Sequence, residues 1–215
     1  MTRSTLTRAL HSVLAVAVIY QLASSLVMEG PKHGHEAPGL RGLLFESHEW
    51  MGLGATAVVV LFWVWSLVRR GETRLGELFP WFSRERMQAL KEDLVRLAGA
   101  LRRRNLPPYE PRSPLAAAIH GLGLALVGAM ALTGTVYFIF HGWAGEAGAA
   151  AKAAVEVHTT LANLVWAYLI GHAGMALLHQ LFGHDIIQPM FTLRQRAGHA
   201  GSKTEPQGDP SRSAL

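Results

Sequence analysis

The side chains best able to do chemistry in this sequence are its histidines. Eleven occur among 215 residues, whereas cysteine is absent. A chain without cysteine has no disulfide framework, thiolate-bound zinc, iron–sulfur cluster or thiol nucleophile, and no covalently attached c-type haem. Ionisable side chains at membrane depth are costly and therefore indicate function. Five histidines lie in or at the edge of long apolar stretches: His11, His48, His120, His158 and His172.

Two of these histidines share one apolar stretch, and their spacing is informative. His158 and His172 are 14 residues apart. On an α-helix this spacing corresponds to about 21 Å along the axis and to about a 40° difference in direction. The two rings therefore project from nearly the same face at opposite membrane depths. They are too far apart for one zinc ion, whose nitrogen ligands lie at about 2.0–2.1 Å, but each can bind a different haem, one in each leaflet.

Depth predicts the partner of each of these two histidines. His48 precedes the outer end of the second apolar stretch and is level with His158. His11 and His120 both lie near the inner ends of their stretches and compete as partners of His172. Depth alone does not separate His11 from His120.

The elements that must position these histidines are four stretches without Asp, Glu, Lys or Arg. They are Ala9–Met28, Trp50–Val68, Leu115–Phe140 and Val157–His184. Each is near or above the roughly 20 residues that a helix needs to cross a membrane. The sequence therefore predicts an all-α integral membrane protein with a four-transmembrane-helix bundle over residues 1–195. The alternative for the first stretch is a cleaved signal peptide, because Arg3 and Arg8 precede it.

The basic residues predict the orientation of the chain. Four spans place both termini on one side, and that side carries 17 Lys and Arg residues against three on the other, Lys32, Arg41 and Lys152. The positive-inside rule makes the richer side cytoplasmic. The basic balance is thus a signal of topology, and nothing in the sequence indicates a nucleic-acid partner. The predicted location is the bacterial inner membrane, with both termini cytoplasmic.

The long connection between the second and third spans predicts a further helix. Met87, Leu90, Leu94, Leu97 and Leu101 follow spacings of three and four. This periodicity indicates an amphipathic helix on the cytoplasmic membrane face, with Ser83 as its N-cap. Its basic end either contacts anionic lipid headgroups or is a solvated face. Residues 196–215 are rich in Gly, Ser and Pro and are predicted to form a disordered cytoplasmic tail.

The histidine pattern resembles the bacterial cytochrome b-561 and Ni-hydrogenase cytochrome b family, which includes the gamma subunits of membrane formate dehydrogenases. The most specific stretch is His158-Thr-Thr-Leu-Ala-Asn163-Leu, running to Ile170-Gly171-His172, and the resemblance covers Thr7–Phe191. It implies that His11 and His172 bind an inner haem b and that His48 and His158 bind an outer one.

The resemblance also implies a second group of residues around the inner haem. It places His120 beside that haem, near its propionates or a quinone. In formate dehydrogenase gamma subunits an aromatic-Asn-x-x-Gln-Lys segment precedes the third span; here Tyr109–Pro114 replaces its Asn, Gln and Lys. The residues expected to contact quinone or propionate are His120, Tyr109, Glu110, Arg8 and Arg112.

Three functional classes follow. The first is an electron-transfer subunit, not itself catalytic, that carries electrons between a peripheral hydrogenase- or dehydrogenase-type partner and the quinone pool through two non-covalent haems b. The second is a stand-alone cytochrome b-561 that oxidises or reduces quinone. The third is a non-redox membrane protein whose histidines bind metal or stabilise structure.

Overall fold

The computed structural model describes residues 4–31, 37–70, 72–103, 110, 113–144, 148–183 and 187–191. Within these ranges every regular element is helical. The long helices are α1 (Thr5–Ser25), α2 (Leu40–Val68), α4 (Arg84–Arg102), α5 (Pro114–Ala144) and α6 (Ala149–Leu181). The short ones are α3 (Leu75–Leu78), the 3₁₀ turn η1 (Pro80–Phe82) and α7 (Ile187–Phe191).

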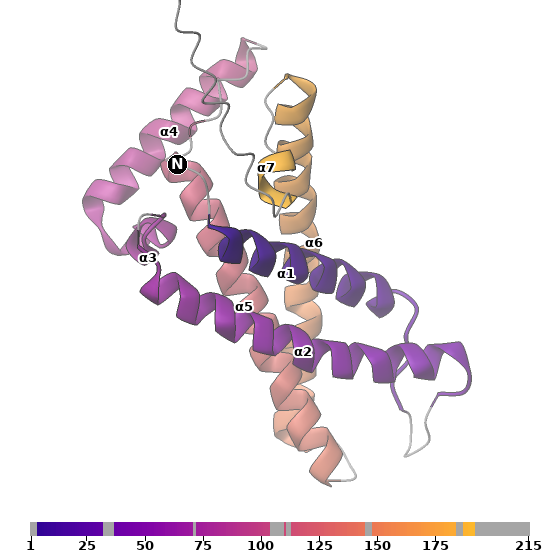
Figure 1. Cartoon of the computed structure of the whole chain (residues 1–215). Helices are drawn as coiled ribbons and strands as arrows, with labels where there is room; N and C mark the ends of the chain where they lie inside the picture. Colours follow the sequence, from indigo (N-terminus) through magenta and orange to yellow (C-terminus); the bar gives the residue numbers. More distant parts are fainter. Residues whose placement is uncertain are drawn as a thin grey trace, which may run out of the picture.

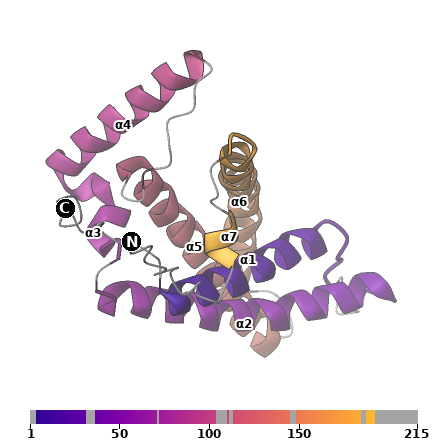
Figure 2. The same ribbon diagram turned by 45° about the horizontal axis from the view of Figure 1, so that its top comes forward.

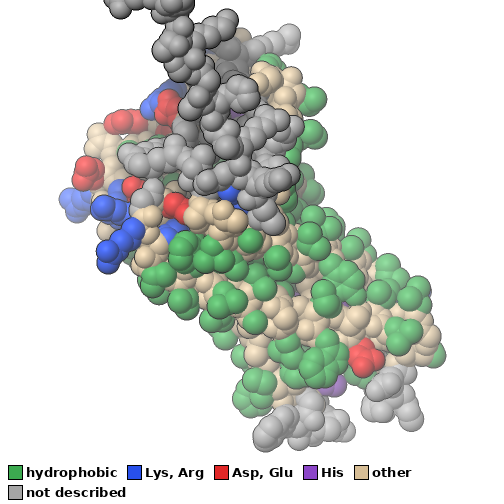
Figure 3. Space-filling model, viewed as in Figure 1, with side chains coloured by type: hydrophobic (Ala, Val, Ile, Leu, Met, Phe, Trp, Pro, Cys, Tyr) green, Lys and Arg blue, Asp and Glu red, His purple; other side chains and the backbone are tan. Residues whose placement is uncertain are grey.

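Four of these helices are long and apolar enough to cross a membrane: α1, α2, α5 from Pro114 to His141, and α6. The predicted all-α, four-span fold is thereby confirmed. Large apolar side chains such as Val16, Val60 and Ile170 are more than half exposed along these helices, and hydrophobic side chains cover much of the face seen in Figure 3. Such a surface matches hydrocarbon rather than water.

The spans pack as two antiparallel pairs that cross each other (Figures 1 and 2). α1 packs on α2, α5 packs on α6, and α2 joins the two pairs by packing on α5. One end of the bundle holds the start of α1, the end of α2, the start of α5 and the end of α6, together with α4. We call it the α4 end, and the opposite one the far end.

α2, which forms the second span, is longer than the apolar stretch predicted from the sequence. α2 starts at Leu40 rather than near Trp50, so its first turns include Arg41, Glu46 and Glu49. A charge-free window detects only the part of a helix that fits hydrocarbon, whereas the hydrogen-bonded helix continues beyond it. His48 consequently lies inside α2 and not before it.

The amphipathic helix in the long connection is confirmed as α4. Its N-cap is Ser83, whose hydroxyl accepts a hydrogen bond from the backbone N–H of Arg86. The buried carboxylate of Asp93 accepts hydrogen bonds from the Ser113 hydroxyl (2.6 Å) and the Leu115 backbone N–H (3.1 Å). α4 thus places a negative charge at the start of α5, where the helix dipole favours it.

A polar junction fastens the start of α1 to the connection that follows α2. Glu72 accepts hydrogen bonds from the Ser4 backbone N–H (3.0 Å) and from the hydroxyl of Thr7 (2.8 Å), which is almost fully buried. The indole N–H of Trp65 donates to the same hydroxyl at 2.8 Å, and the Arg69 guanidinium lies 3.8 Å from the Glu72 carboxylate. These contacts fix the register of α1 against α2 at the α4 end.

Candidate functional site

The far end of the bundle brings His48 of α2 and His158 of α6 face to face. Their ring centroids are 6.4 Å apart and the ring planes are inclined by 80°. Both side chains are half-buried. The sequence predicted this pair from depth alone, and the structure brings the two residues together.

In each ring of this pair, a side-chain hydroxyl group lies within hydrogen-bonding distance of the Nδ1 atom. The Oγ of Ser24, from α1, lies 3.0 Å from Nδ1 of His48. The Oγ1 of Thr133, from α5, lies 3.0 Å from Nδ1 of His158. All four spans therefore contribute to this end, two with an imidazole and two with a hydroxyl.

The α4 end holds a second set of aromatic and histidine rings. His11 of α1 and His172 of α6 have ring centroids 6.4 Å apart, inclined by 56°. His120 of α5 is nearer to His172, at 5.3 Å, and its Nδ1 lies 2.5 Å from the Ala116 carbonyl oxygen, one turn earlier in the helix. Tyr168 stacks on His172 at 5.4 Å with the planes only 10° apart.

The separations test whether the residues fit a metal centre with two axial imidazoles. With metal–nitrogen bonds of about 2 Å and ring nitrogens about 1 Å from the ring centre, two imidazoles on opposite sides of one metal have centroids about 6 Å apart. His11–His172 and His48–His158 both meet this value at 6.4 Å, and His120–His172 at 5.3 Å is shorter. Among the described residues no three His, Asp or Glu side chains gather as a zinc site would require.

A glycine also makes room beside the far-end pair. A β-carbon on Gly134 of α5 would lie 3.1 Å from Cε1 of His158, closer than most such contacts. The missing side chain lets the imidazole lie against the α5 backbone. The residues present therefore fit a haem whose iron is bound by one histidine from each side.

The remaining predicted site residues are less completely described. Arg8 is buried within α1, one turn before His11. Glu110 lies near α4, where it accepts a hydrogen bond from Arg96 at 3.4 Å, and is exposed. Tyr109, Arg112 and the predicted tail, residues 196–215, lie outside the described residues.

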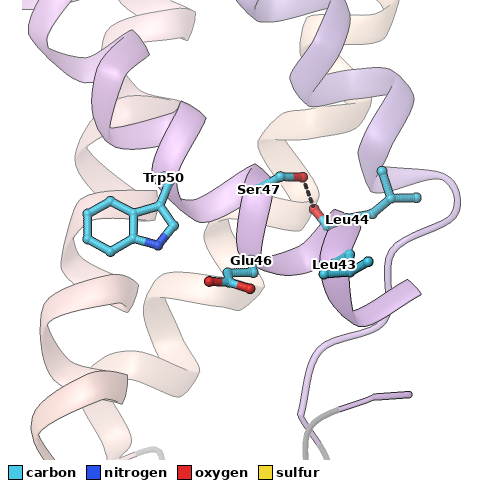
Figure 4. A pocket seen from close by; sticks show the side chains of 5 residues that line it. All are labelled: Leu43, Leu44, Glu46, Ser47 and Trp50. Atoms are coloured by element: carbon cyan, nitrogen blue, oxygen red, sulfur yellow. Dashed lines mark hydrogen bonds between the residues drawn. The ribbon is translucent and has the colours of Figure 1, made fainter. Parts of the chain in front are cut away.

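A surface hollow on α2 does not belong to either histidine set. It is lined by Leu43, Leu44, Glu46, Ser47 and Trp50, all on one helix (Figure 4). Ser47 there donates to the Leu44 carbonyl at 3.0 Å and shares a 2.6 Å hydrogen bond with Tyr20 of α1. Its hydrogen bonds serve the packing of α1 on α2.

Sequence reasoning missed the polar residues that support the histidines. Ser24, Thr133 and Gln21, whose amide donates to the His48 carbonyl at 3.0 Å, lie in apolar spans where nothing marks them individually. Two tryptophans of the second span also have protein partners: Trp63 stacks on Phe79, and Trp65 donates to Thr7.

Four apolar spans, with two pairs of histidine rings facing each other between the helices, define the class: an all-helical, four-span membrane protein. The comparisons with known proteins give the family. The family model described as prokaryotic cytochrome b561 matches residues 2–193, and the chain belongs to that family. The comparisons with curated proteins and with solved structures give no match.

Membership of this family indicates the general activity of the chain. The chain is a multi-pass membrane cytochrome of the b type, embedded in lipid, that binds haem b and takes part in electron transfer.

Proposed function

We propose that the chain binds two haems b, one between His48 and His158 and one between His11 and His172. The observation that carries the proposal is the equal 6.4 Å separation of the ring centroids in the two pairs, which is close to the ~6 Å expected for one metal between two imidazoles. Because His120 lies closer to His172 than such a pair allows, it is a neighbour of the inner haem and not its ligand.

Haem b supplies one-electron redox chemistry when bound. Two protein ligands per iron leave no open coordination position, so the histidines restrict that chemistry to electron transfer. α6 holds one histidine of each pair about 21 Å apart along its axis. The four spans thus fix two redox centres at different depths and insulate them from water.

Haem content tests this proposal. A pyridine haemochrome assay on the purified protein should give two haems per chain. The visible and EPR spectra of the untreated protein should show both haems as low-spin. The His120→Ala variant should keep both. A folded wild-type protein with one haem or none contradicts the proposal, and so does loss of a haem from His120→Ala that equals the loss from His11→Ala.

We place the exchange with quinone at the α4 end. The rings of His120, Tyr168 and His172 gather there, and buried Arg8 lies one turn from His11. A concave apolar site with few polar groups is the usual setting for such a ligand. Tyr109, Glu110 and Arg112 belong to the same proposed region on the sequence pattern.

The His120→Leu variant tests the quinone site. It should slow oxidation of the reduced protein by a quinone analogue at least several-fold while both haems stay bound. Leu177→Ala, on the exposed apolar surface of α6, is the control and should leave the rate unchanged. An unchanged rate in His120→Leu contradicts a role for this residue.

We further propose that the chain is the cytochrome b subunit of a hydrogenase- or dehydrogenase-type complex and links a peripheral oxidoreductase to the quinone pool. The support is a resemblance in sequence: Phe79–Phe82 and Pro108–Pro111 look more like segments of dehydrogenase and hydrogenase membrane anchors than of stand-alone cytochromes. Mild detergent extraction from the native membrane should retain an oxidoreductase subunit with the cytochrome. A fully active cytochrome that purifies alone indicates instead a stand-alone quinol oxidoreductase.

The α4 end is proposed to be cytoplasmic, as are both termini. The excess of Lys and Arg in the sequence lies on this side, and part of it forms the basic group visible beside α3 and α4 in Figure 3. Because the chain has no cysteine, single cysteines test this directly. Ser213→Cys should be shielded from an impermeant maleimide in intact cells and Ala37→Cys should react; the opposite result reverses the orientation.

A further inference from the structure

The hydroxyls of Ser24 and Thr133 each donate a hydrogen bond to backbone carbonyl oxygens of their own helix. Ser24 donates to the Gln21 carbonyl at 3.1 Å. Thr133 donates to the carbonyls of Ala129 at 2.9 Å and Met130 at 3.1 Å. Each hydroxyl has only one proton, but its oxygen has two lone pairs. In the contact with the histidine, the hydroxyl oxygen is therefore the acceptor and the ring Nδ1–H is the donor.

The same arrangement on both rings selects one tautomer. With the proton on Nδ1, the lone pair of a neutral imidazole lies on Nε2. His48 and His158 therefore both offer Nε2 to a metal between them. Histidine ligands to metals are generally oriented in this way by an acceptor at the other ring nitrogen.

We propose that Ser24 and Thr133 are positioning residues of the outer haem, which fix the tautomer and ring orientation of His48 and His158 and lower the reduction potential of that haem. The proposal rests on the ligation proposed above. A hydrogen bond from Nδ1–H to an acceptor makes the imidazole a more basic ligand, and a basic ligand favours ferric iron. The chain from ring N–H through hydroxyl to carbonyl reinforces the effect, because each hydrogen bond polarises the next.

The matched variants are Ser24→Ala and Thr133→Val, which remove the hydroxyls and keep similar shapes. Ser24→Thr and Thr133→Ser retain them. Thr135→Val is the control. Thr135 lies two residues from Thr133 on the same helix, and its hydroxyl lies 3.3 Å from that of Thr56 rather than near a histidine.

Optical redox titration of the purified holoprotein, with low-temperature EPR of the oxidised form, is the measurement. We expect Ser24→Ala and Thr133→Val each to raise the ferrous-to-ferric ratio of the outer haem about threefold at a fixed potential, which is about 28 mV at ~59 mV per decade. Its EPR signal should shift as well. The inner haem, the hydroxyl-retaining variants and Thr135→Val should match the wild type.

Each other outcome decides the question. Unchanged potential and EPR signal in both hydroxyl-free variants, with two haems bound, overturns the proposal, and so does an equal shift in Thr135→Val. A hydroxyl-free variant could lose the outer haem altogether. In that case, retention of this haem in Thr133→Ser and Ser24→Thr supports the proposal. Loss of the haem from these hydroxyl-retaining variants as well overturns it. Two results would overturn the proposed ligation instead. One is a wild-type protein that lacks the outer haem, and the other is a His48→Ala variant that keeps it.

Discussion

The imidazole of His158 is confined from two sides, by the Thr133 hydroxyl at Nδ1 and by the bare α5 backbone at Gly134. These contacts leave the ring little freedom to turn. A preorganised ligand spends less free energy on ordering when the metal binds. In the proposed outer haem site, the His158 ring is therefore held in place by residues that are not themselves ligands.

The substitution Gly134→Ala tests this confinement at the scale of one methyl group. The new β-carbon would lie 3.1 Å from the His158 ring, so the ring or the helix must shift, at a typical overpacking cost of about 1–3 kcal/mol. We expect weaker retention or an altered spectrum of the outer haem, measured by optical titration of haem release in detergent.

Gly128→Ala is the matched control for that substitution. It lies on the same helix, and its β-carbon would meet Trp63 at the same 3.1 Å. It should affect thermal stability and leave the outer haem spectrum as in the wild type. Equal spectral effects of the two variants would show that general strain in α5, not contact with His158, is responsible.

At the scale of elements, α6 sets the distance between the two sites and the junction at Glu72 sets the register of α1. Burial alone would raise the pKa of the Glu72 carboxyl. The hydroxyls of Ser4 and Thr7, the Ser4 backbone N–H and the Arg69 guanidinium together hold that pKa below its usual value. The charged form is therefore favoured by folding.

The Glu72→Gln variant should reveal this contribution. Because the pKa is lowered on folding, the carboxylate stabilises the protein above pH ~4.5 and loses that effect as pH falls through the folded-state pKa. Differential scanning calorimetry in mild detergent should show a lower Tm for Glu72→Gln at pH 7 and a gap to the wild type that narrows below about pH 4.5. A gap independent of pH contradicts the charge-based account.

The Thr7→Val variant examines the other half of the junction. Its hydroxyl joins Trp65 to Glu72, and removal of a buried partner of this kind costs about 1–3 kcal/mol. The Tm at pH 7 should fall by several degrees. Thr159→Val is the control. Among the described contacts, the exposed Thr159 hydroxyl bonds only to carbonyls of its own helix, so this substitution should change the Tm little.

The four spans and the amphipathic helix could be predicted from sequence because lipid selects for long apolar stretches and because caps and periodicity are local. The partner of His158 followed from depth, since the ends of antiparallel spans share a level. The roles of Ser24, Thr133 and Thr7 could not be predicted. A hydroxyl in an apolar helix ordinarily bonds to its own backbone, and only tertiary packing shows which of them also reaches another helix.

At the scale of the whole molecule, the two proposed haems would lie at different depths, so the membrane potential would act on electrons that pass between them. If electrons enter outside and leave inside, each moves toward the negative side, at a cost of up to about 2.3 kcal/mol per 100 mV for a full crossing. That route works best when the inner haem has the higher potential.

Redox titration of variants assigns the two potentials. His48→Ala should remove the outer haem's wave and His11→Ala the inner one's. We expect the inner wave at the higher potential. An inner wave well below the outer one indicates the reverse route, quinol oxidation inside with delivery outward, and weakens the case for a dehydrogenase-type anchor.

The pairing of four histidines, His11 with His172 and His48 with His158, is the central claim, and haem content of double variants tests it most directly. Each single change to alanine should lower the haem-to-protein ratio from two to one. Combining changes within a pair, as in His48→Ala with His158→Ala, should leave one haem, whereas combining across pairs, as in His48→Ala with His11→Ala, should leave none. A within-pair double variant without haem, or a cross-pair double variant that keeps one, would contradict the account.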